Sequence, residues 1–471
     1  MRNPDAVVVG AGPNGLTAAI ILAKSGLRVQ VYEAASTPGG GTRTAELTVP
    51  GVLHDVCSAV HPLGVASPVF QSFRLQDFGL EWIHPRYPLV HPLDGGKAAV
   101  LERSLRATAE RLGADAAAYH RLFENFTENA DALLRDFLGP VQFPVHPFLY
   151  ARFGLKALRS AETLARSYFK GESARALFAG MAAHSFLALD ETASAAVGLM
   201  LGLAGHAYGW PIARGGSQSI TSSLVACLKH AAGEIMLNHR ITSWDQLPAH
   251  CPVLFDVTPQ QLLKICGDRF PLSYQKRLQA FEYGPGIFKL DWTLSARVPW
   301  LAAAAHETAT LHLGGNLEEI AASESAMRQG KVHPRPFVLI AQPSVVDASR
   351  TRDGRSALWG YCHVPPYSSE DMTDRIEAQI ERFAPGFQKL IIARHRMFPA
   401  DFEAYNGNYI GGSISGGLMN LRQTLQRPRL FSNPYATPDP RIFLCSSSTP
   451  PGPGVHGMCG WHAALAVLGR R

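Results

Sequence analysis

Charged residues are scarce in this chain. Only 17% of the 471 residues are charged, whereas 46% are hydrophobic. The chain is therefore able to bury a large core, and its length favours two domains over one. Its 44 basic and 38 acidic residues leave a net charge of +6. That charge is too dilute over this length to indicate a protein that binds nucleic acid.

Three further features are missing. The 7 cysteines include no C-x-x-C pair, which argues against a disulfide framework and against a zinc site, so no bound metal is expected. No signal-peptide pattern precedes the first expected strand, and a cytoplasmic location is expected. The longest nearly apolar run, residues 193–205, is shorter than the roughly 18 residues that suggest a membrane-spanning helix. It is expected to form a buried helix.

The segment AVVVGAGPNGLTAAIILAKSGLRVQVYEA, residues 6–34, has the pattern of a strand, a glycine-rich turn, a helix and a second parallel strand. Gly10, Gly12 and Gly15 follow the first strand with G-x-G-x-x-G spacing. Such glycines make the tight turn, let the backbone approach a pyrophosphate, and let the helix pack closely on the strand. The segment therefore predicts a dinucleotide-binding unit.

Two details refine this prediction. Pro13 and Asn14 begin the helix, whose free N–H groups and positive dipole end favour phosphates. Glu33 ends the second strand and is placed to accept hydrogen bonds from the adenosine ribose. Its charge would repel a 2′-phosphate, so NADP is disfavoured at this site.

A second glycine-rich loop separates FAD from NAD as the expected cofactor. The loop STPGGGTRTAEL, residues 36–47, holds Gly40, Gly41 and the permanently charged Arg43. An NAD enzyme has no general need of such a loop. Flavoproteins commonly have one, because their long cofactor crosses the domain and a second loop must pass close to the pyrophosphate and the flavin. We therefore predict FAD.

The C-terminal segment RIFLCSSSTPPGPGVHGMCGWHAALAVL, residues 441–468, repeats the order of strand, glycine loop and helix. Its spacing would not hold a pyrophosphate. The start of its helix can instead face the pyrimidine edge of a flavin, where negative charge accumulates on reduction. Five residues are predicted to lie at the flavin: Gly454, Val455, His456, Gly457 and Met458.

The motifs GAGPNGLTAA, GGGTR and STPPGPGVHGMCG, with DVCSAVHPLGVASPVF at residues 55–70, resemble one family over essentially the whole chain. This family is the phytoene desaturase-like (phytoene dehydrogenase-related) branch of the FAD-dependent amine oxidase and carotenoid desaturase superfamily. The resemblance implies that the backbone near Ile241 lies against the adenine. It also implies that the segment from Ser58 to His61 lies near the isoalloxazine ring.

The resemblance and the expected elements together predict an α/β fold. A discontinuous, Rossmann-like FAD-binding domain is expected to comprise residues 1–60, 205–285 and 426–471. An inserted α+β substrate-binding domain is expected to comprise residues 61–204 and 286–425. The cleft between two such domains is a usual place for a substrate.

The family resemblance implies an FAD-dependent oxidoreductase that transfers hydride between a substrate carbon and flavin N5. The reaction would desaturate, saturate or isomerise a hydrophobic substrate, an isoprenoid or a lipid, with oxygen or a quinone as electron acceptor. His456 and His61 are the candidate catalytic side chains, although His456 is equally expected to cap its helix. Carotenoid desaturases commonly read THPGAGVPG where this chain reads TPPGPGVHG, which weakens the case for phytoene itself.

Two other functions stay open. A flavin amine oxidase would share the fold, and it would need an aromatic cage or a carboxylate clamp at the flavin. A flavoprotein that binds a lipid or a partner without turnover is the third possibility.

A basic helix expected over residues 150–171 bears on membrane contact. Five basic residues would share one of its faces: Arg152, Lys156, Arg159, Arg166 and Lys170. A solvated face is the favoured interpretation, and a helix at a membrane surface is the alternative.

Overall fold

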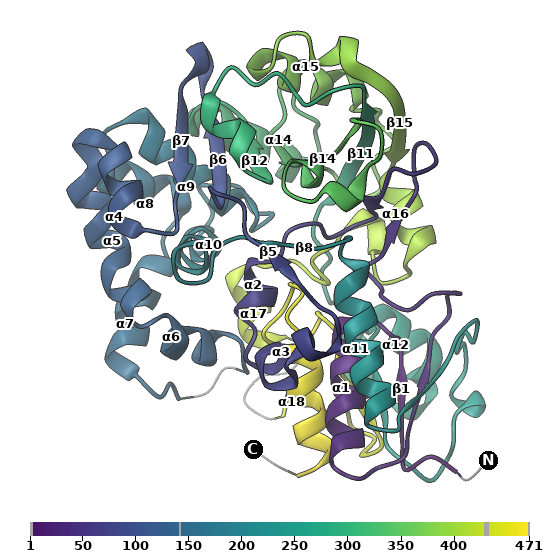
Figure 1. Cartoon of the computed structure of the whole chain (residues 1–471). Coiled ribbons are helices and arrows are strands. Elements are labelled where there is room, and N and C mark those ends of the chain that lie inside the picture. The colour runs from purple at the N-terminus through teal and green to yellow at the C-terminus, as the bar shows by residue number, and fades with distance from the viewer. Residues whose placement is uncertain (1–2, 141–142, 428–432, 470–471) are drawn as a thin grey trace.

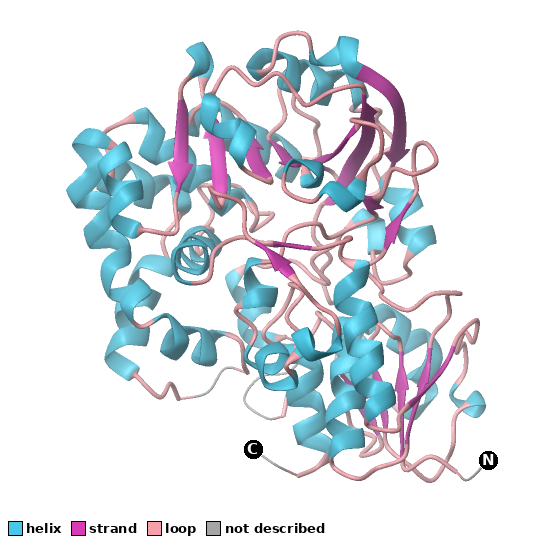
Figure 2. Ribbon diagram, in the orientation of Figure 1, coloured by secondary structure: helices cyan, strands magenta, loops and turns pink. Residues whose placement is uncertain are grey.

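Two β-sheets organise the molecule. The computed structural model describes residues 3–140, 143–427 and 433–469. A five-stranded sheet lies at the lower right of Figure 1, near both marked ends of the chain, and a seven-stranded sheet lies at the top. Figure 2 shows helices on the flanks of both sheets and a helical region at the left.

The five-stranded sheet is parallel throughout, as in a Rossmann-like fold. Its strands, in spatial order, are β16 (Ile442–Leu444), β10 (Val253–Phe255), β1 (Ala6–Val9), β2 (Val29–Tyr32) and β9 (Glu234–Met236). They come from stretches of the chain that are far apart in sequence, so the sheet is discontinuous. The α/β class and the two N-terminal strands are confirmed.

Helices cover both faces of this sheet. The side chains of β1 alternate between the two faces, so they pack into two different cores. Ala6 and Val8 pack with the first group of helices: α1 (Pro13–Lys24), α11 (Gln218–His230) and α18 (Met458–Val467). Val7 and Val9 pack with the second group: α12 (Pro259–Cys266) and α13 (Leu272–Gln279). The glycine that closes α1, Gly26, has a φ of +90°, as its place after the helix predicts.

The seven-stranded sheet is antiparallel except where β12 pairs with β6. Its strands, in spatial order, are β15 (Ile391–Met397), β11 (Gly286–Leu294), β14 (Ser356–Val364), β13 (Val338–Ala341), β12 (Thr310–Leu313), β6 (Leu89–Pro92) and β7 (Ala98–Leu101). Its last two strands, β6 and β7, form an antiparallel hairpin. The faces of β13 and β14 help to form the site described below.

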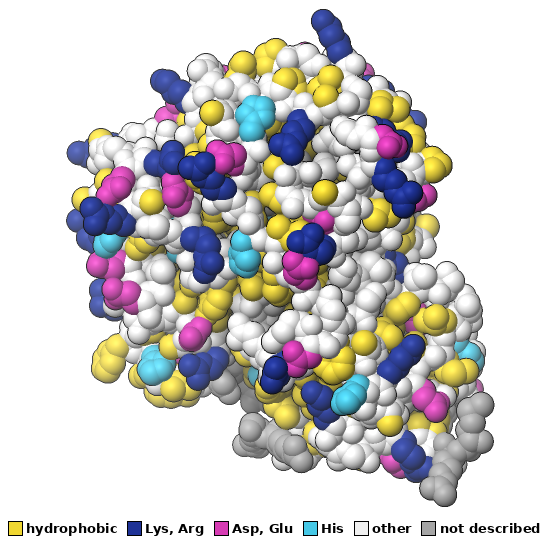
Figure 3. Space-filling view, in the orientation of Figure 1, with side chains coloured by type: hydrophobic (Ala, Val, Ile, Leu, Met, Phe, Trp, Pro, Cys, Tyr) yellow, Lys and Arg dark blue, Asp and Glu magenta, His cyan; other side chains and the backbone are white. Residues whose placement is uncertain are grey.

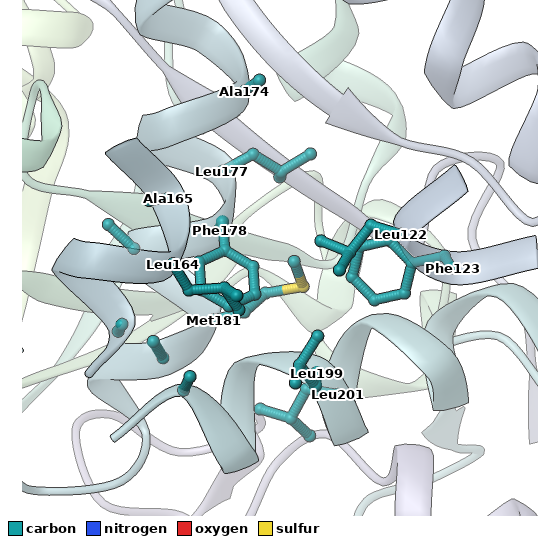
Figure 4. Close-up of a cluster of buried hydrophobic side chains, with 14 of the residues drawn as sticks. Leu122, Phe123, Leu164, Ala165, Ala174, Leu177, Phe178, Met181, Leu199 and Leu201 are labelled. Atoms are coloured by element: carbon teal, nitrogen blue, oxygen red, sulfur yellow. The ribbon is translucent and has the colours of Figure 1, made fainter. Parts of the chain in front are cut away.

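A helical region packs beside β6 and β7. It contains α4 (Leu105–Arg111), α5 (Ala116–Glu128), α6 (Ala130–Phe137), α7 (Pro147–Ala157), α8 (Ala161–Tyr168), α9 (Glu172–Ala183) and α10 (Ala195–Ala207). Figure 4 shows its core, in which Phe123, Phe178 and Leu199 converge from three of these helices. The apolar run at 193–205 forms α10, a largely buried helix as predicted. None of the helices described is long and apolar enough to cross a membrane.

The remaining helices and strands are as follows. They are α2 (Pro62–Val65), α3 (Pro68–Phe73), α14 (Leu317–Arg328), α15 (Thr373–Phe383), α16 (Pro399–Tyr405), α17 (Leu421–Gln426), β3 (Thr44–Ala45), β4 (His54–Asp55), β5 (Trp82–Ile83) and β8 (Ile212–Ala213).

The prediction of a single basic helix over residues 150–171 is wrong, because two helices occupy this stretch. The Ser160 side chain accepts a hydrogen bond from the Thr163 N–H and caps a new helix, α8, so α7 ends before it. Arg166 therefore lies on α8, where it pairs with Glu162 and Glu318. The five basic residues do not share one helix face.

Candidate cofactor and substrate site

One cavity connects the two sheets. It has a volume of about 480 Å³, within the range of small-molecule sites. At one end it is lined by residues at the carboxyl ends of β1, β2 and β10, and at the other by side chains of β13 and β14. The carboxyl edge of a parallel sheet is where ligands bind in open α/β folds.

Most of the residues predicted from sequence line this cavity. They are Gly10, Gly12, Pro13, Asn14, Glu33, Gly40, Gly41, Arg43, His61, Ile241, Gly454, Val455 and His456. Gly15, Gly457 and Met458 lie behind its wall. A Cβ on Gly15 would stand 2.0 Å from the carbonyl oxygen of Gly10, so Gly15 serves the close packing of helix and strand.

The N-terminus of α1 is open toward the cavity. Among the residues described, the backbone N–H groups of Gly12 and Asn14 donate to no protein atom. The Asn14 side-chain oxygen is buried and also has no hydrogen-bond partner in the part of the chain that the structure describes. These groups and the helix dipole form a site suited to an anion such as a pyrophosphate.

Glu33 holds the turn and the second glycine loop together. Its carboxylate accepts hydrogen bonds from the N–H groups of Ala11, at 2.8 Å, and Ala35, at 2.9 Å. Arg43 reaches the same carboxylate at 3.4 Å and donates to the Thr37 carbonyl at 2.7 Å. A carboxylate has about four acceptor positions, so Glu33 retains capacity for a ligand hydroxyl.

Asp256 is a site residue that the sequence analysis missed. It follows β10 and lines the cavity beside the N-terminus of α1, where its carboxylate accepts the Gly15 N–H at 3.0 Å. Burial raises the pKa of Asp256 to about 7, and the charge of Glu33 adds to this rise. The available signal was an acidic residue at the end of a buried strand, the same signal that identified Glu33.

Aromatic rings and glycines shape the cavity near this end. The rings of Tyr32 and His239 are stacked with centroids 4.7 Å apart, and both residues line the cavity. Of the two, His239 is the one close to Ile241 in the chain. A Cβ on Gly41 would lie 2.4 Å from the Tyr409 hydroxyl. Only a residue without a side chain therefore fits here.

The start of α18 is capped by its own loop. The Met458 N–H donates to Nδ1 of His456 at 3.1 Å, and burial lowers the pKa of this imidazole to about 4. A neutral ring that accepts through Nδ1 fits a helix cap. The sequence left His456 as either a catalytic side chain or a helix cap, and the geometry favours the helix cap.

His61 occupies a different position. The segment from Cys57 to Gly64 lines the cavity, and Nδ1 of His61 lies 3.3 Å from the Ser58 hydroxyl. Its Nε2 atom is buried, and no described residue forms a hydrogen bond with it. Burial lowers the pKa of His61 to about 4, so the ring is neutral near pH 7.

The far end of the cavity is apolar and aromatic. Trp359 and Tyr361 of β14 meet edge to face with ring centroids 5.2 Å apart, and Phe186 lines the same wall. Further apolar lining residues are Phe137, Leu138, Val197, Met200, Leu201, Leu339, Ile414 and Met419. The only carboxylates among the described lining residues are Glu33 and Asp256, both at the opposite end.

A charged cluster lies behind this wall, on β11. Lys289 and Asp291 form a fully buried ion pair, and the Lys289 ammonium lies 5.7 Å from the centroid of the Trp359 ring. Burial lowers the pKa of Lys289, while the charge of Asp291 opposes the shift. The sequence analysis missed this pair. Its signal was a K-x-D spacing that places both side chains on one strand face.

Comparisons with known proteins agree with this architecture. Residues 8–74 match the family model of an NAD(P)-binding Rossmann-like domain. The chain is 24% identical over 559 aligned positions to "Pyridine nucleotide-disulfide oxidoreductase domain-containing protein 2" of Rattus norvegicus, covering 98% of this chain and 93% of that protein.

Two solved structures share the fold over almost the whole chain. An oxidoreductase from Methanosarcina mazei has a TM-score of 0.66 at 13% identity, covering 99% of this chain and all of the other. Putrescine oxidase bound to putrescine has a TM-score of 0.62 at 18% identity, covering 99% of each chain. The chain therefore has the fold of these oxidoreductases, with a nucleotide-binding type of Rossmann-like domain at its N-terminal end.

Proposed function

We propose that this chain binds FAD in the cavity and acts as an oxidoreductase on carbon–carbon bonds of an apolar substrate. The observation that carries the proposal is the continuity of the cavity. It joins a polar end at the N-terminus of α1 to an apolar end on β13 and β14. A dinucleotide with a redox ring would extend from the first end toward the second.

The residues present fit such a cofactor. The free N–H groups of Gly12 and Asn14 suit the pyrophosphate, and Glu33 suits the ribose hydroxyls. The stacked Tyr32 and His239, near Ile241, offer a surface for the adenine. The segments 40–43, 57–64 and 451–456 line the cavity between its two ends, where the flavin would lie.

The chain's own residues would provide binding, orientation and exclusion of water. When bound, FAD would supply the redox chemistry by exchanging hydride with a substrate carbon, with oxygen or a quinone as the final acceptor. Phe186, Trp359 and Tyr361 would hold an apolar substrate. Among the described residues, the Nε2 atoms of His61 and of His456 are buried without a partner, and burial lowers both pKa values to about 4. Because Nδ1 of His456 already accepts from the Met458 N–H, we assign the proton-exchanging role to His61.

The second candidate function is oxidation of an amine. The edge-to-face pair of Trp359 and Tyr361 in the cavity favours it, because aromatic faces attract cations. The absence of a carboxylate from the described lining of the apolar end argues the other way. We therefore rank the apolar substrate first, and an isoprenoid or lipid is the class that this end of the cavity suits.

Anaerobic flavin reduction tests these alternatives. We expect an isoprenoid or lipid substrate to bleach the absorbance of the bound flavin, whereas bleaching by primary amines with peroxide formation in air would establish the amine oxidase. Reduction by dithionite alone would favour a binding protein without turnover. Met200→Glu should abolish reduction by the apolar substrate with FAD retained, since Met200 lines the apolar end, and Met200→Leu is its volume-matched control.

A further inference from the structure

Exposed apolar side chains concentrate in one short stretch of the helical region. Of the 12 large hydrophobic residues exposed in the described structure, 5 lie between residues 143 and 158. They are Phe143 (85% exposed), Val145 (73%), Phe148 (87%), Leu155 (73%) and Leu158 (49%). Figure 3 shows yellow side chains gathered at the lower left, where Figure 1 places α7. Such a patch marks an interaction surface.

Helix α7 packs against the protein through one face and exposes its other face to solvent. Phe153 and Ala157 are buried one turn apart, and the Phe153 ring lies 4.4 Å from that of Phe137 on α6. Phe148 and Leu155, two turns apart, are exposed on another face. The exposed face is therefore part of a helix that its inner side anchors.

The same stretch carries only positive charge. Residues 143–159 contain Arg152, Lys156 and Arg159 and no acidic residue. Among the described residues these three side chains form no ion pair, in contrast to Arg166 of the next helix, which pairs with Glu162 and Glu318. Arg159 donates to the Thr163 carbonyl at 3.3 Å, and the Lys156 ammonium lies 5.2 Å from the centroid of the Phe126 ring, but neither charge is neutralised by a carboxylate among the described residues. The excess of positive charge suits a partner that supplies many negative charges.

We propose that residues 143–159, the docking surface, attach the protein to a lipid bilayer that contains anionic lipids. Apolar side chains that enter the acyl boundary, flanked by basic side chains at the headgroups, are the features of an interfacial helix. A symmetric contact with a second copy would bring the basic residues of two chains together without acidic partners. The charge pattern therefore favours the bilayer over self-association.

The docking surface adjoins the cavity. Phe137 and Leu138 at the end of α6 line the cavity, and the Phe137 ring lies 5.1 Å from that of Tyr150 on α7. One aromatic residue thus contacts both the cavity and the helix that carries the surface. Attachment here would place an apolar substrate in the bilayer close to the cavity, but the docking proposal rests on the exposed residues and not on the proposed reaction.

Vesicle flotation of the full chain with its cofactor tests the proposal. We expect the protein to float with vesicles of phosphatidylcholine and phosphatidylserine at low salt, and to float much less with phosphatidylcholine alone or at high salt. Leu155→Ser and Arg152→Glu should each weaken binding about tenfold. The matched controls are Leu272→Ser, at a residue 72% exposed, and Arg277→Glu, both on α13 and remote in sequence from the surface.

Unchanged circular dichroism and flavin content would show that the variants are folded. The proposal is overturned if the wild type fails to float with anionic vesicles, or if the α7 and α13 variants bind alike. It is also overturned if sedimentation shows a dimer that Phe148→Ser dissociates, since the surface would then join two copies of the chain. None of these readouts requires turnover, so they are independent of the proposed reaction.

Discussion

Helices α1 and α18 both begin beside the cavity after a strand and a glycine-rich loop, yet their N-termini differ. At α1 the N–H groups of Gly12 and Asn14 have no acceptor within the described part of the chain. At α18 the Met458 N–H already donates to Nδ1 of His456. Similar sequence patterns therefore produce one helix end that is open to an anionic ligand and one that its own loop has capped.

The two helices also depend on each other for position. A Cβ on Gly460 of α18 would lie 1.9 Å from the backbone oxygen of Asn14, so the capped helix packs directly on the open end. This packing indicates that α18 supports the N-terminal end of α1. Its contact with a flavin stays a proposal.

Separating α1 from α18 should have the largest effect on stability and on cofactor retention. Gly460→Ala forces backbone against backbone, and we expect it to lower the free energy of unfolding by about 3 kcal/mol or more and to reduce cofactor retention. Chemical denaturation and flavin content measure both. Gly154→Ala is the control, because nothing lies within 4 Å of its Cβ position in α7, and it should stabilise by about 0.5–1 kcal/mol. Equal stability of the two variants would refute the close packing.

Changing the charge of Asp256, beside the open N-terminus of α1, should have an intermediate effect on stability and on FAD affinity, and this effect should depend on pH. Since burial raises the pKa of Asp256 from 3.8 to about 7, the folded state binds more protons than the unfolded state between these values. The contribution of Asp256 to the free energy of unfolding is therefore present at low pH and is lost as pH rises toward about 7. Ionised Asp256 should also repel an anionic cofactor, so FAD affinity should fall several-fold between about pH 6 and about pH 8.

Asp256→Asn removes the titrating group at nearly constant shape. We expect its FAD affinity and its free energy of unfolding to vary less with pH than those of the wild type, measured by titration of the apoprotein and by denaturation across the same range. A pH profile identical to that of the wild type would exclude Asp256 as the titrating group.

Removing the cap of α18 should have the smallest effect. His456→Ala leaves the Met458 N–H without its acceptor, and we expect a loss of about 1 kcal/mol in the free energy of unfolding. His456→Asn, which keeps a short polar side chain, should recover part of that loss. If His456 only caps the helix, both variants retain flavin and turnover. A large fall in turnover with unchanged stability would instead place His456 in the reaction.

Local patterns predicted the N-terminal unit because its turn, helix and acid depend on neighbours in sequence. The open end of α1, Glu33 and the order of strands and helices from residue 6 to residue 34 are such features. Asp256 and Tyr409 enter the same site from distant parts of the chain. The place of Asp256 at the end of a buried strand was a local signal, but no spacing connects either residue with the N-terminal unit. Only the fold brings them together.

Two other outcomes depended on competing local effects. The periodic basic residues suggested one helix across Ser160, whereas that serine caps a new helix, and a cap outweighs the periodicity of exposed charges. The orientation of His456 is set by the irregular loop before α18. Residue type alone therefore left its role undecided.

Release of the bound cofactor tests the central claim most directly. The gently purified protein is denatured, and the released molecules are identified by mass spectrometry and absorbance. We expect the wild-type protein to release one FAD per chain. We expect Gly12→Val to release none, because a Cβ at this position would lie 2.7 Å from Oδ2 of Asp256. A folded wild-type protein that releases no flavin and does not take up added FAD would contradict the account.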